Sequence, residues 1–507
     1  MTLARTTSVA VLGVEGQLVE IQADLADGLP GVTMIGLPDA ALQEARDRIR
    51  AAIVNSGETW PARRMTLALL PATLPKRGSM FDVALAVGVL AAAGAVPPER
   101  LDEVVLLGEL GLDGRLRSTR GVLPAVMAAA RTGIHRVVVP AANLAEATLV
   151  PGLDVRGVAQ LADLLAFLRG DPDRTVARPA VRQRPERPGP DLRDVVGQAI
   201  GRRAVEVAAA GGHHLLFTGP PGSGKTMLAE RLPGVLPPLA VEEALEVTAV
   251  HSVAGLLAAD APLVRRPPYQ APHHSASAAA LVGGGSRQAR PGAASLSHRG
   301  ILFLDEAPEF QAGVLDALRQ PLESGEVTIA RSGGVARYPA RFQLVLAANP
   351  CPCAAPAGEA ECRCTATARR RYIGRISGPL LDRMDLQVQL EPVVPGELLD
   401  GLDRAESSAA VASRVAAARA AAAERLRGTG WRINADVPGP ALRSRWRLPA
   451  KVTAAADARL DRGDLSARGY DRVLRVAWSV SDLAGRARPT AADVEEAVAL
   501  RSHWSTR

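Results

Sequence analysis

The chain has 507 residues, enough for two or three domains that each bury a core, and its 47% hydrophobic and 22% charged residues are ordinary for a soluble globular protein. The net charge of +7 permits a polyanionic partner but does not require one, because a solvated arginine-rich surface gives the same excess. No signal-like layout opens the chain, and its longest apolar run, residues 83–97, is too short and too rich in alanine to span a bilayer. The sequence therefore predicts a cytoplasmic protein without a membrane partner.

Residues 1–168 alternate β-like runs with stretches of helical spacing. Strands are expected over 9–13, 18–22, 31–35, 65–70, 104–110 and 137–140, and helices over 40–56, 81–93 and 120–132. This pattern predicts an α/β domain that contains neither a phosphate loop nor a metal cluster.

Two stretches of this region, residues 74–80 and 108–116, resemble the Lon-protease-like domain with a ribosomal S5-type fold. In the proteases a serine nucleophile and a lysine follow these stretches, but the matching positions here hold Met80 and Pro124, which cannot act as nucleophile or base. Ser79 is one residue away, with only Lys76 nearby to activate it. The resemblance therefore implies a non-proteolytic scaffold or a DNA-contacting domain, with a peptidase as the alternative.

A linker is expected over residues 169–192, because residues 171–190 are dense in proline, arginine and acidic residues and lack apolar periodicity. This linker separates the N-terminal region from two further regions, expected over 193–398 and 399–507.

A phosphate-binding loop follows the apolar run 215–218 and opens the helical stretch 227–232. It comprises Gly219, Pro220, Pro221, Gly222, Ser223, Gly224, Lys225 and Thr226. A strand, a glycine loop, Lys-Thr and a helix in this order make a P-loop, in which backbone N–H groups and the helix N-terminus bind phosphates. We expect Lys225 to reach the β- and γ-phosphates of a nucleoside triphosphate and Thr226 to ligate Mg²⁺.

Two further apolar runs end in polar residues. The run 301–304 ends in Asp305 and Glu306, and the run 342–348 ends in Asn349. Because ligands bind at the carboxyl ends of parallel strands, we expect Asp305 to hold Mg²⁺ and Glu306 to polarise the attacking water. Asn349 is interpreted as the residue that orients this water, with a turn-forming Asn-Pro as the alternative.

Residues 400–507 read as helical, with a hairpin earlier in the chain. Residues 326–338 alternate around a glycine turn and predict a β-hairpin. Helices are expected over 406–426, 448–462, 470–486 and 489–498, which would form a small lid over the nucleotide.

These motifs together resemble AAA+ ATPases, and the resemblance implies roles for four more residues. Val196 and Gln198 would lie near the adenine, unless this segment only starts a helix. Arg383, in residues 376–386, matches the arginine that magnesium chelatases and MCM helicases insert into the neighbouring subunit's site. A cis ion pair of Arg383 with Asp382 or Asp385 is the alternative. Arg468 matches the sensor 2 position, for which Arg472 and Arg475 compete.

All four cysteines lie close together in the sequence, which does not suit a secreted disulfide framework. Cys351, Cys353, Cys362 and Cys364 form two Cys-x-Cys pairs. Four thiolates this close suit a structural tetrahedral Zn²⁺ site, with buried or redox-active thiols as the alternative. The adjacent His273 and His274 have no further ligands nearby in the sequence and are interpreted as structural.

The whole chain except the linker resembles the YifB/ComM family of magnesium-chelatase-like proteins, through residues 272–275, 349–353 and 377–383. The resemblance implies an ATP-driven, homohexameric DNA motor that promotes branch migration during recombination of incoming DNA in natural transformation, with single-stranded or branched DNA as partner. For the DNA contact we single out Arg331 and Arg337 on the predicted hairpin. The rival readings are the ATPase subunit of a metal chelatase and a MoxR-like protein-remodelling chaperone.

Overall fold

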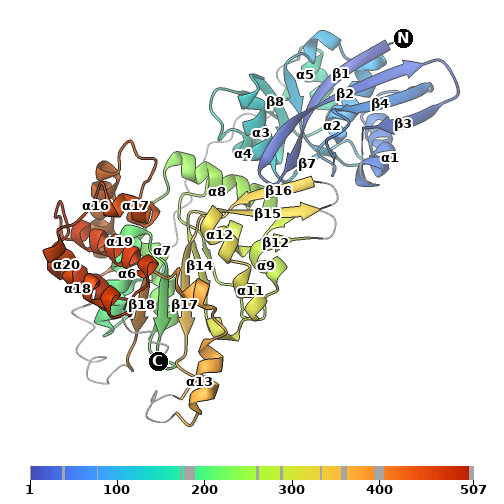
Figure 1. Ribbon diagram of the computed structural model, residues 1–507. Coiled ribbons are helices and arrows are strands. Elements are labelled where there is room, and N and C mark those ends of the chain that lie inside the picture. Colours follow the sequence, from blue (N-terminus) through green and yellow to red (C-terminus); the bar gives the residue numbers. More distant parts are fainter. Residues whose placement is uncertain are drawn as a thin grey trace.

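The computed structural model describes residues 2–36, 40–76, 78–171, 174–175, 189–258, 262–285, 289–331, 334–355, 362–392 and 405–501. One sheet forms in the N-terminal third and a second around the phosphate-binding loop, and the C-terminal helices pack beside the second sheet (Figure 1). This confirms the predicted fold class. Residues 176–188 of the predicted linker lie outside the described residues.

The N-terminal sheet has the strand order β3-β4-β2-β1-β5-β8-β9. Its strands are β1 (Thr2–Leu12), β2 (Glu15–Ala26), β3 (Gly31–Ile35), β4 (Arg64–Leu70), β5 (Val104–Leu106), β8 (Arg136–Pro140) and β9 (Asp154–Val158). Its helices are α1 (Ala40–Asn55), α2 (Asp82–Ala92), α3 (Val122–Arg131), α4 (Leu144–Ala147) and α5 (Leu161–Leu168). β1 and β2 form a long antiparallel hairpin, whereas β5, β8 and β9 run parallel.

Helix α2 forms the centre of the N-terminal core. All of its residues are buried, as expected for a helix that is apolar on nearly every side. Its one charged residue, Asp82, accepts two hydrogen bonds from the Arg48 guanidinium of α1, at 2.7 and 3.0 Å. This bidentate contact supplies the partner that a buried carboxylate needs.

The strand predicted over 104–110 is wrong in its extent. The structure breaks it into β5 and the short β6 (Glu109–Leu110), which pairs with β7 (Leu116–Arg117) outside the main sheet. The break falls at Gly108, whose φ of 149° is a conformation that only glycine adopts readily. A Cβ there would stand 3.0 Å from Val83, so the chain also needs glycine for close packing against α2.

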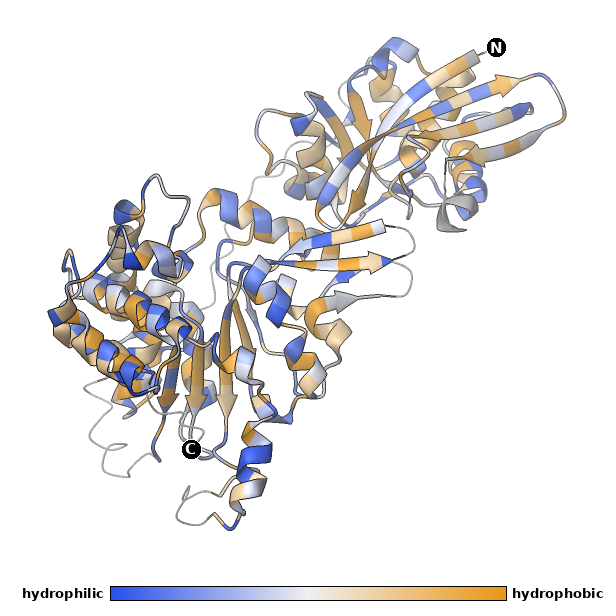
Figure 2. Cartoon of the chain, viewed as in Figure 1, coloured by the Kyte–Doolittle hydropathy of each residue, from blue (hydrophilic) through white to orange (hydrophobic). Residues whose placement is uncertain are grey.

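The second sheet is parallel throughout, with the order β11-β14-β17-β10-β18. Its strands are β10 (Leu215–Thr218), β11 (Tyr269–Gln270), β14 (Ile301–Leu304), β17 (Gln343–Ala348) and β18 (Leu386–Gln389). Every residue of β10, β14 and β17 is buried, because helices cover both faces of the sheet. In Figure 2 these strands are hydrophobic along most of their length.

Longer helices and a hairpin surround this sheet. They are α6 (Ala199–Gly211), α7 (Lys225–Val235), α8 (Val241–Ala254), β15 (Glu326–Arg331) and β16 (Gly334–Pro339). Shorter elements are α9 (Ala278–Val282), β12 (Gly283–Gly284), β13 (Arg290–Pro291), α10 (Ala293–Leu296), α11 (Ala312–Asp316), α12 (Arg319–Ser324), α13 (Ala366–Ile373) and α14 (Gly378–Leu381). The predicted hairpin over 326–338 is therefore present, as the pair β15 and β16.

The C-terminal helices share a core with the P-loop side of the second sheet. They are α16 (Ser408–Arg425), α17 (Gly439–Arg443), α18 (Ala450–Asp461), α19 (Ala467–Leu483) and α20 (Ala491–Ala499). The side chains of Ser407, Ser466 and Thr490 cap α16, α19 and α20 by accepting backbone N–H bonds. α16 and α19 pack against α6, so that Val415 and Trp478 join one core with Phe217 of β10.

Helix α8 joins the N-terminal region to the second sheet, as Figure 1 shows. Ser252 of α8 donates a hydrogen bond to the buried carboxylate of Glu146, and its carbonyl accepts from the Gly121 N–H at 3.2 Å. Ala249 of α8 belongs to a core cluster otherwise built from N-terminal residues. Within the described residues, no helix has both the length and the apolar character to cross a membrane.

Candidate functional site

The P-loop connects β10 to α7, and different physical constraints require glycine at its different positions. Gly222 and Gly224 adopt φ values of 78° and 86°, in the left-handed region that favours glycine. At Gly219 the constraint is space, because a Cβ would stand 2.6 Å from the carbonyl oxygen of Leu390. The loop can therefore turn its backbone N–H groups toward a phosphate at the N-terminus of α7.

Lys225 is folded back onto this loop. Its Nζ donates hydrogen bonds to the carbonyl oxygens of Gly219 and Pro220, both at 2.8 Å. Burial lowers the pKa of Lys225, while the charges of Asp305 and Glu306 oppose that shift. The ammonium group thus has two local acceptors that phosphate oxygens could replace.

The structure brings Thr226 and Asp305 together, although they are far apart in sequence. Thr226 Oγ1 donates to Asp305 Oδ2 at 2.7 Å, and the Glu306 N–H donates to Asp305 Oδ1 at 2.9 Å. Thr226 lies in the first turn of α7 and Asp305 directly follows β14. A hydroxyl and a carboxylate are oxygen ligands of the type that Mg²⁺ takes. These two residues could therefore hold the ion that accompanies a nucleotide.

Glu306 is directed toward a residue that the sequence did not single out as functional. Its Oε2 lies 3.2 Å from Nδ1 of His274, and its backbone has a φ of 50°. His274 was interpreted as structural. The β11 strand that leads to it has two residues and gave no recognisable signal, so the contact could not be foreseen.

Asn349 is the first residue after β17. Because β17 lies between β14 and β10, Asn349 follows the strand that separates Asp305 from the P-loop. It is half-buried there. The predicted position for a water-orienting amide is thus consistent with the sheet order.

Arg383 is in a cis ion pair, but its partner differs from the two expected. Its guanidinium pairs with Glu323 of α12 and donates to the Pro379 carbonyl at 2.7 Å. Asp385 binds Arg472 instead, and Asp382 lies 3.7 Å from Arg468. The alternative of a cis pair with Asp382 or Asp385 is therefore not what the structure shows, because the carboxylate that pairs with Arg383 comes from α12.

Of the three candidates for the sensor 2 position, Arg468 is the most exposed. Its side chain is 76% exposed at the start of α19. Arg472 is committed to the buried Asp385, and Arg475 donates to the carbonyl of Val437 at 2.6 Å. Arg468 therefore has the greatest freedom to reach a ligand.

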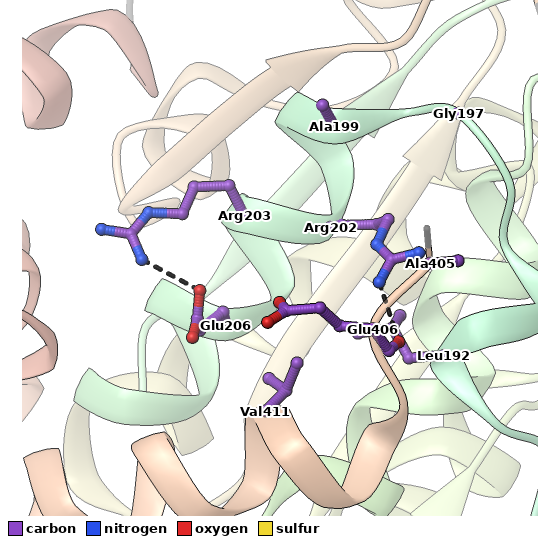
Figure 3. Close-up of a pocket in the computed structure, with 9 residues that line it drawn as sticks. All are labelled: Leu192, Gly197, Ala199, Arg202, Arg203, Glu206, Ala405, Glu406 and Val411. Carbon is purple, nitrogen blue, oxygen red and sulfur yellow. Dashed lines mark hydrogen bonds and ion pairs between the residues drawn. The ribbon is translucent and has the colours of Figure 1, made fainter. Parts of the chain in front are cut away.

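The segment expected near the adenine borders a cavity between α6 and α16. The cavity has a volume of about 380 Å³, and of residues 196–198 only Gly197 lines it (Figure 3). Its polar side chains include Arg202, Arg203, Glu206 and Glu406. Val196 is buried, and Gln198 donates to the Glu391 carbonyl at 2.5 Å, so the structure does not bring these two side chains into the cavity.

The four cysteines converge on one point beyond β17. The sulfur atoms of Cys351, Cys353, Cys362 and Cys364 all lie within 4.8 Å of one another. The Sγ atoms of Cys351 and Cys353 are 3.1 Å apart. Four sulfurs at this spacing fit the ligand set of one tetrahedral Zn²⁺.

Both arginines of the hairpin are exposed. Arg331 ends β15, and Arg337 lies on β16, where the turn at Gly13 approaches its backbone.

In the N-terminal region Ser79 donates to Glu109 and Lys76 to the Pro71 carbonyl, while Met80 and Pro124 are buried. These contacts give Ser79 an acidic partner.

Comparison with known proteins shows which family this chain belongs to. Family models described as magnesium chelatase subunit ChlI, subunit ChlI of Mg-chelatase and the ChlI C-terminal region match residues 191–398, 21–143 and 405–501. Competence protein ComM of Haemophilus influenzae is 40% identical over 506 residues, covering 99% of this chain and 98% of ComM. The chain belongs to the YifB/ComM family of magnesium-chelatase-like proteins.

Other relatives agree with this family. YifB of Salmonella typhimurium is 41% identical, over 99% of this chain and 97% of its own, and an uncharacterized protein of Mycobacterium tuberculosis is 58% identical over both full lengths. A Lon protease of Mycolicibacterium smegmatis is 28% identical over 171 residues, 32% of this chain and 22% of the protease. Membership of the YifB/ComM family implies the use of a nucleotide and Mg²⁺, and the predicted family and fold are confirmed.

Proposed function

We propose that this protein is an ATP-hydrolysing motor that works on DNA as a ring of six subunits and promotes branch migration when incoming DNA recombines during natural transformation. The observation that carries the proposal is the 2.7 Å hydrogen bond between Thr226 and Asp305 beside the P-loop, in a chain that matches a competence protein over its whole length. The Thr226–Asp305 contact supports nucleotide hydrolysis, and the match to a competence protein supports DNA as the substrate.

Each residue of the site has a step in the hydrolysis. Lys225 exchanges its two loop carbonyls for phosphate oxygens, and Thr226 and Asp305 hold Mg²⁺, which neutralises phosphate charge when bound. Glu306 takes the proton of the attacking water, and Asn349 orients that water. The guanidinium that stabilises the transition state comes from Arg383 of the neighbouring subunit.

In this proposal the ring brings Arg383 to a nucleotide, because within its own chain the Arg383 guanidinium is paired with an acid outside the P-loop. It pairs with Glu323 of α12 rather than with the P-loop residues of its own chain. In our proposal, ring closure brings Arg383 to the next subunit's nucleotide, so that hydrolysis depends on assembly. Arg468 assists from α19 within its own subunit.

DNA contact is assigned to the hairpin of β15 and β16. Arg331 and Arg337 are both exposed there, and a hairpin facing a ring's pore presents its charge to phosphates. Contacts of this kind bind the backbone and carry no sequence information. The cysteine cluster is assigned a structural Zn²⁺, which would rigidify the loop that follows Asn349.

A second candidate is the ATPase subunit of a metal chelatase, which the description of the matching family models favours. A MoxR-like remodelling role shares the same nucleotide site. Neither candidate requires DNA, and this difference separates them from the motor.

The test is ATP hydrolysis by the full chain with and without forked DNA, with Glu306→Gln as the control that keeps nucleotide binding. We expect forked DNA to stimulate hydrolysis and Glu306→Gln to abolish it. Hydrolysis that ignores DNA would favour the chelatase or remodelling candidates, and no hydrolysis under any condition would reject the proposal.

A further inference from the structure

A strongly basic segment begins at the last pair of cysteines. Residues 362–381 contain five arginines and no aspartate or glutamate, whereas the whole chain has 53 acidic residues in 507, or about two in every twenty. These arginines are Arg363, Arg369, Arg370, Arg371 and Arg375. Within the described residues, only Arg375 pairs with a carboxylate, that of Glu309 at 3.1 Å. The other four positive charges are therefore not neutralised in the described part of the chain.

Helix α13 divides three of these arginines between two faces. Arg370 and Arg371 are exposed, and they follow the exposed Thr367 by three and four residues, so all three lie on one side of the helix. Tyr372 is buried on the other side. Arg369 is half-buried, and its Nε donates to the carbonyl of Cys364 at 3.4 Å. Arg370 and Arg371 are therefore the pair that a ligand in solution can reach.

Both ends of α13 are held in place. Thr365 caps its start by accepting from the Ala368 N–H at 3.2 Å, directly after Cys364 of the cysteine cluster. Beyond its end, Arg375 Nη1 donates to the Pro308 carbonyl and to Glu309, both at 3.1 Å. The backbone that carries the exposed arginines is therefore already ordered, which lowers the entropic cost of binding a ligand there.

The α13 arginines and the hairpin lie at opposite ends of strand β17. The hairpin immediately precedes β17, and the cysteine cluster and α13 follow it. In Figure 1, α13 extends beyond the carboxyl ends of the strands, whereas β15 and β16 lie beside the N-terminal region. A strand of six residues is about 20 Å long. Because phosphates follow one another every 3.4 Å along a DNA strand, contact with both surfaces requires roughly six base pairs or more.

We propose that Arg370 and Arg371 of α13, with the exposed Arg363, form a second DNA-binding surface that holds the phosphodiester backbone at the far end of β17 from the hairpin. The inference rests on the proposed function and adds a contact for a second length of the same DNA. Guanidinium groups bind phosphate oxygens in a bidentate manner, and such contacts carry no sequence information. A forked DNA offers backbone to both surfaces at once.

The experiment compares the double variant Arg370→Ala/Arg371→Ala with the matched control Arg459→Ala/Arg462→Ala in the full chain. The control removes the same charge from the end of α18, where Asp464 lies 3.9 Å from Arg459 and 3.2 Å from Arg462. Affinity for forked DNA is measured by fluorescence anisotropy over a series of salt concentrations in the presence of ATP. Sedimentation under the same conditions reports whether the ring assembles.

We expect the α13 double variant to bind forked DNA roughly ten-fold more weakly, for unrelated sequences alike, and to lower the slope of log affinity against log salt by about two. The control should stay within about two-fold of the wild type, because its arginines are already paired at the surface. Adding Arg331→Ala to the α13 double variant should multiply the two losses, since the surfaces are far apart. Ring assembly should match that of the wild type.

The second surface is rejected if the α13 double variant binds DNA as the control does. It is also rejected if the α13 double variant loses ring assembly, which would assign these arginines to the contact with a neighbouring subunit. Failure of the proposed function is a different result, in which the wild-type protein itself binds no DNA.

Discussion

Arg472 of α19 donates a hydrogen bond at 2.7 Å to the carboxylate of Asp385, which is 2% exposed. The other carboxylate oxygen of Asp385 accepts from the backbone N–H of His214 at 2.9 Å, immediately before β10. One buried acid therefore joins the C-terminal helices, the strand that leads to the P-loop and the segment that carries Arg383. A movement of any one of these three parts would therefore be transmitted to the other two through Asp385.

The first prediction concerns this acid. Burial alone would raise the pKa of Asp385, but the nearby positive charge of Arg472 outweighs burial and lowers the pKa. Asp385→Asn leaves Arg472 with no anionic partner, and we expect it to reduce the free energy of unfolding by about 3 kcal/mol. Chemical denaturation measures this. Arg468→Ala, which breaks an exposed pair, is the control and should change stability by less than about 0.5 kcal/mol; an equally small change in Asp385→Asn would refute the assignment.

The second prediction is a pH dependence. His213 is fully buried and His214 is half-buried, and desolvation lowers the pKa of each from 6.5 to about 4. The unfolded chain therefore takes up protons first as the pH falls, so the stability from these neutral histidines is complete above pH 6.5 and declines toward pH 4. His213→Gln keeps a partner for Ser479 and removes one titrating group, so its unfolding curves should lose stability less steeply. Equal slopes for the two proteins would contradict the prediction.

The third prediction concerns the cysteine cluster. Purified protein should contain about one Zn²⁺ per chain, and Cys353→Ser should lose most of it, because three thiolates bind the ion less tightly than four. Elemental analysis measures the metal, and a thiol reagent counts accessible sulfhydryls. A zinc-free protein with four reactive thiols would show that these are free cysteines.

The fourth prediction concerns the hairpin. Arg331→Ala should weaken DNA binding to the same degree for unrelated sequences and lower the slope of log affinity against log salt by roughly one. Binding is measured by fluorescence anisotropy over a series of salt concentrations. Arg290→Ala, a change at an exposed arginine of β13, serves as the comparison. Unchanged affinity and slope for Arg331→Ala would remove it from the DNA interface.

Much of the nucleotide site could be predicted from the sequence, because the patterns that indicate it are local. The apolar runs before Gly219, Asp305 and Asn349 each predict a buried parallel strand, and the sheet brings their carboxyl ends together. The spacing of the cysteine pairs also indicates a four-thiolate site, and in the structure the four sulfurs lie close together.

The contacts that the sequence did not reveal are long-range pairings from weak elements. His274 follows a strand of two residues, and Glu323 lies on a helix of six, so neither had a periodic signal. The break at Gly108 was hidden inside a continuous apolar run. In each case the outcome depends on how the sheet and its covering helices assemble, and no local sequence pattern encodes that assembly.

The most direct test of the ring motor is a mixing experiment on ATP hydrolysis in the presence of forked DNA. Arg383→Ala subunits keep an intact P-loop site but lend no arginine, whereas Glu306→Gln subunits lend Arg383 but cannot hydrolyse. Each variant alone should be slower than the wild type, by roughly 10³-fold for Arg383→Ala. We predict that mixing the two restores hydrolysis well above the sum of the separate rates, because a mixed ring contains complete sites. Full activity of Arg383→Ala alone, or no recovery on mixing, would contradict the account.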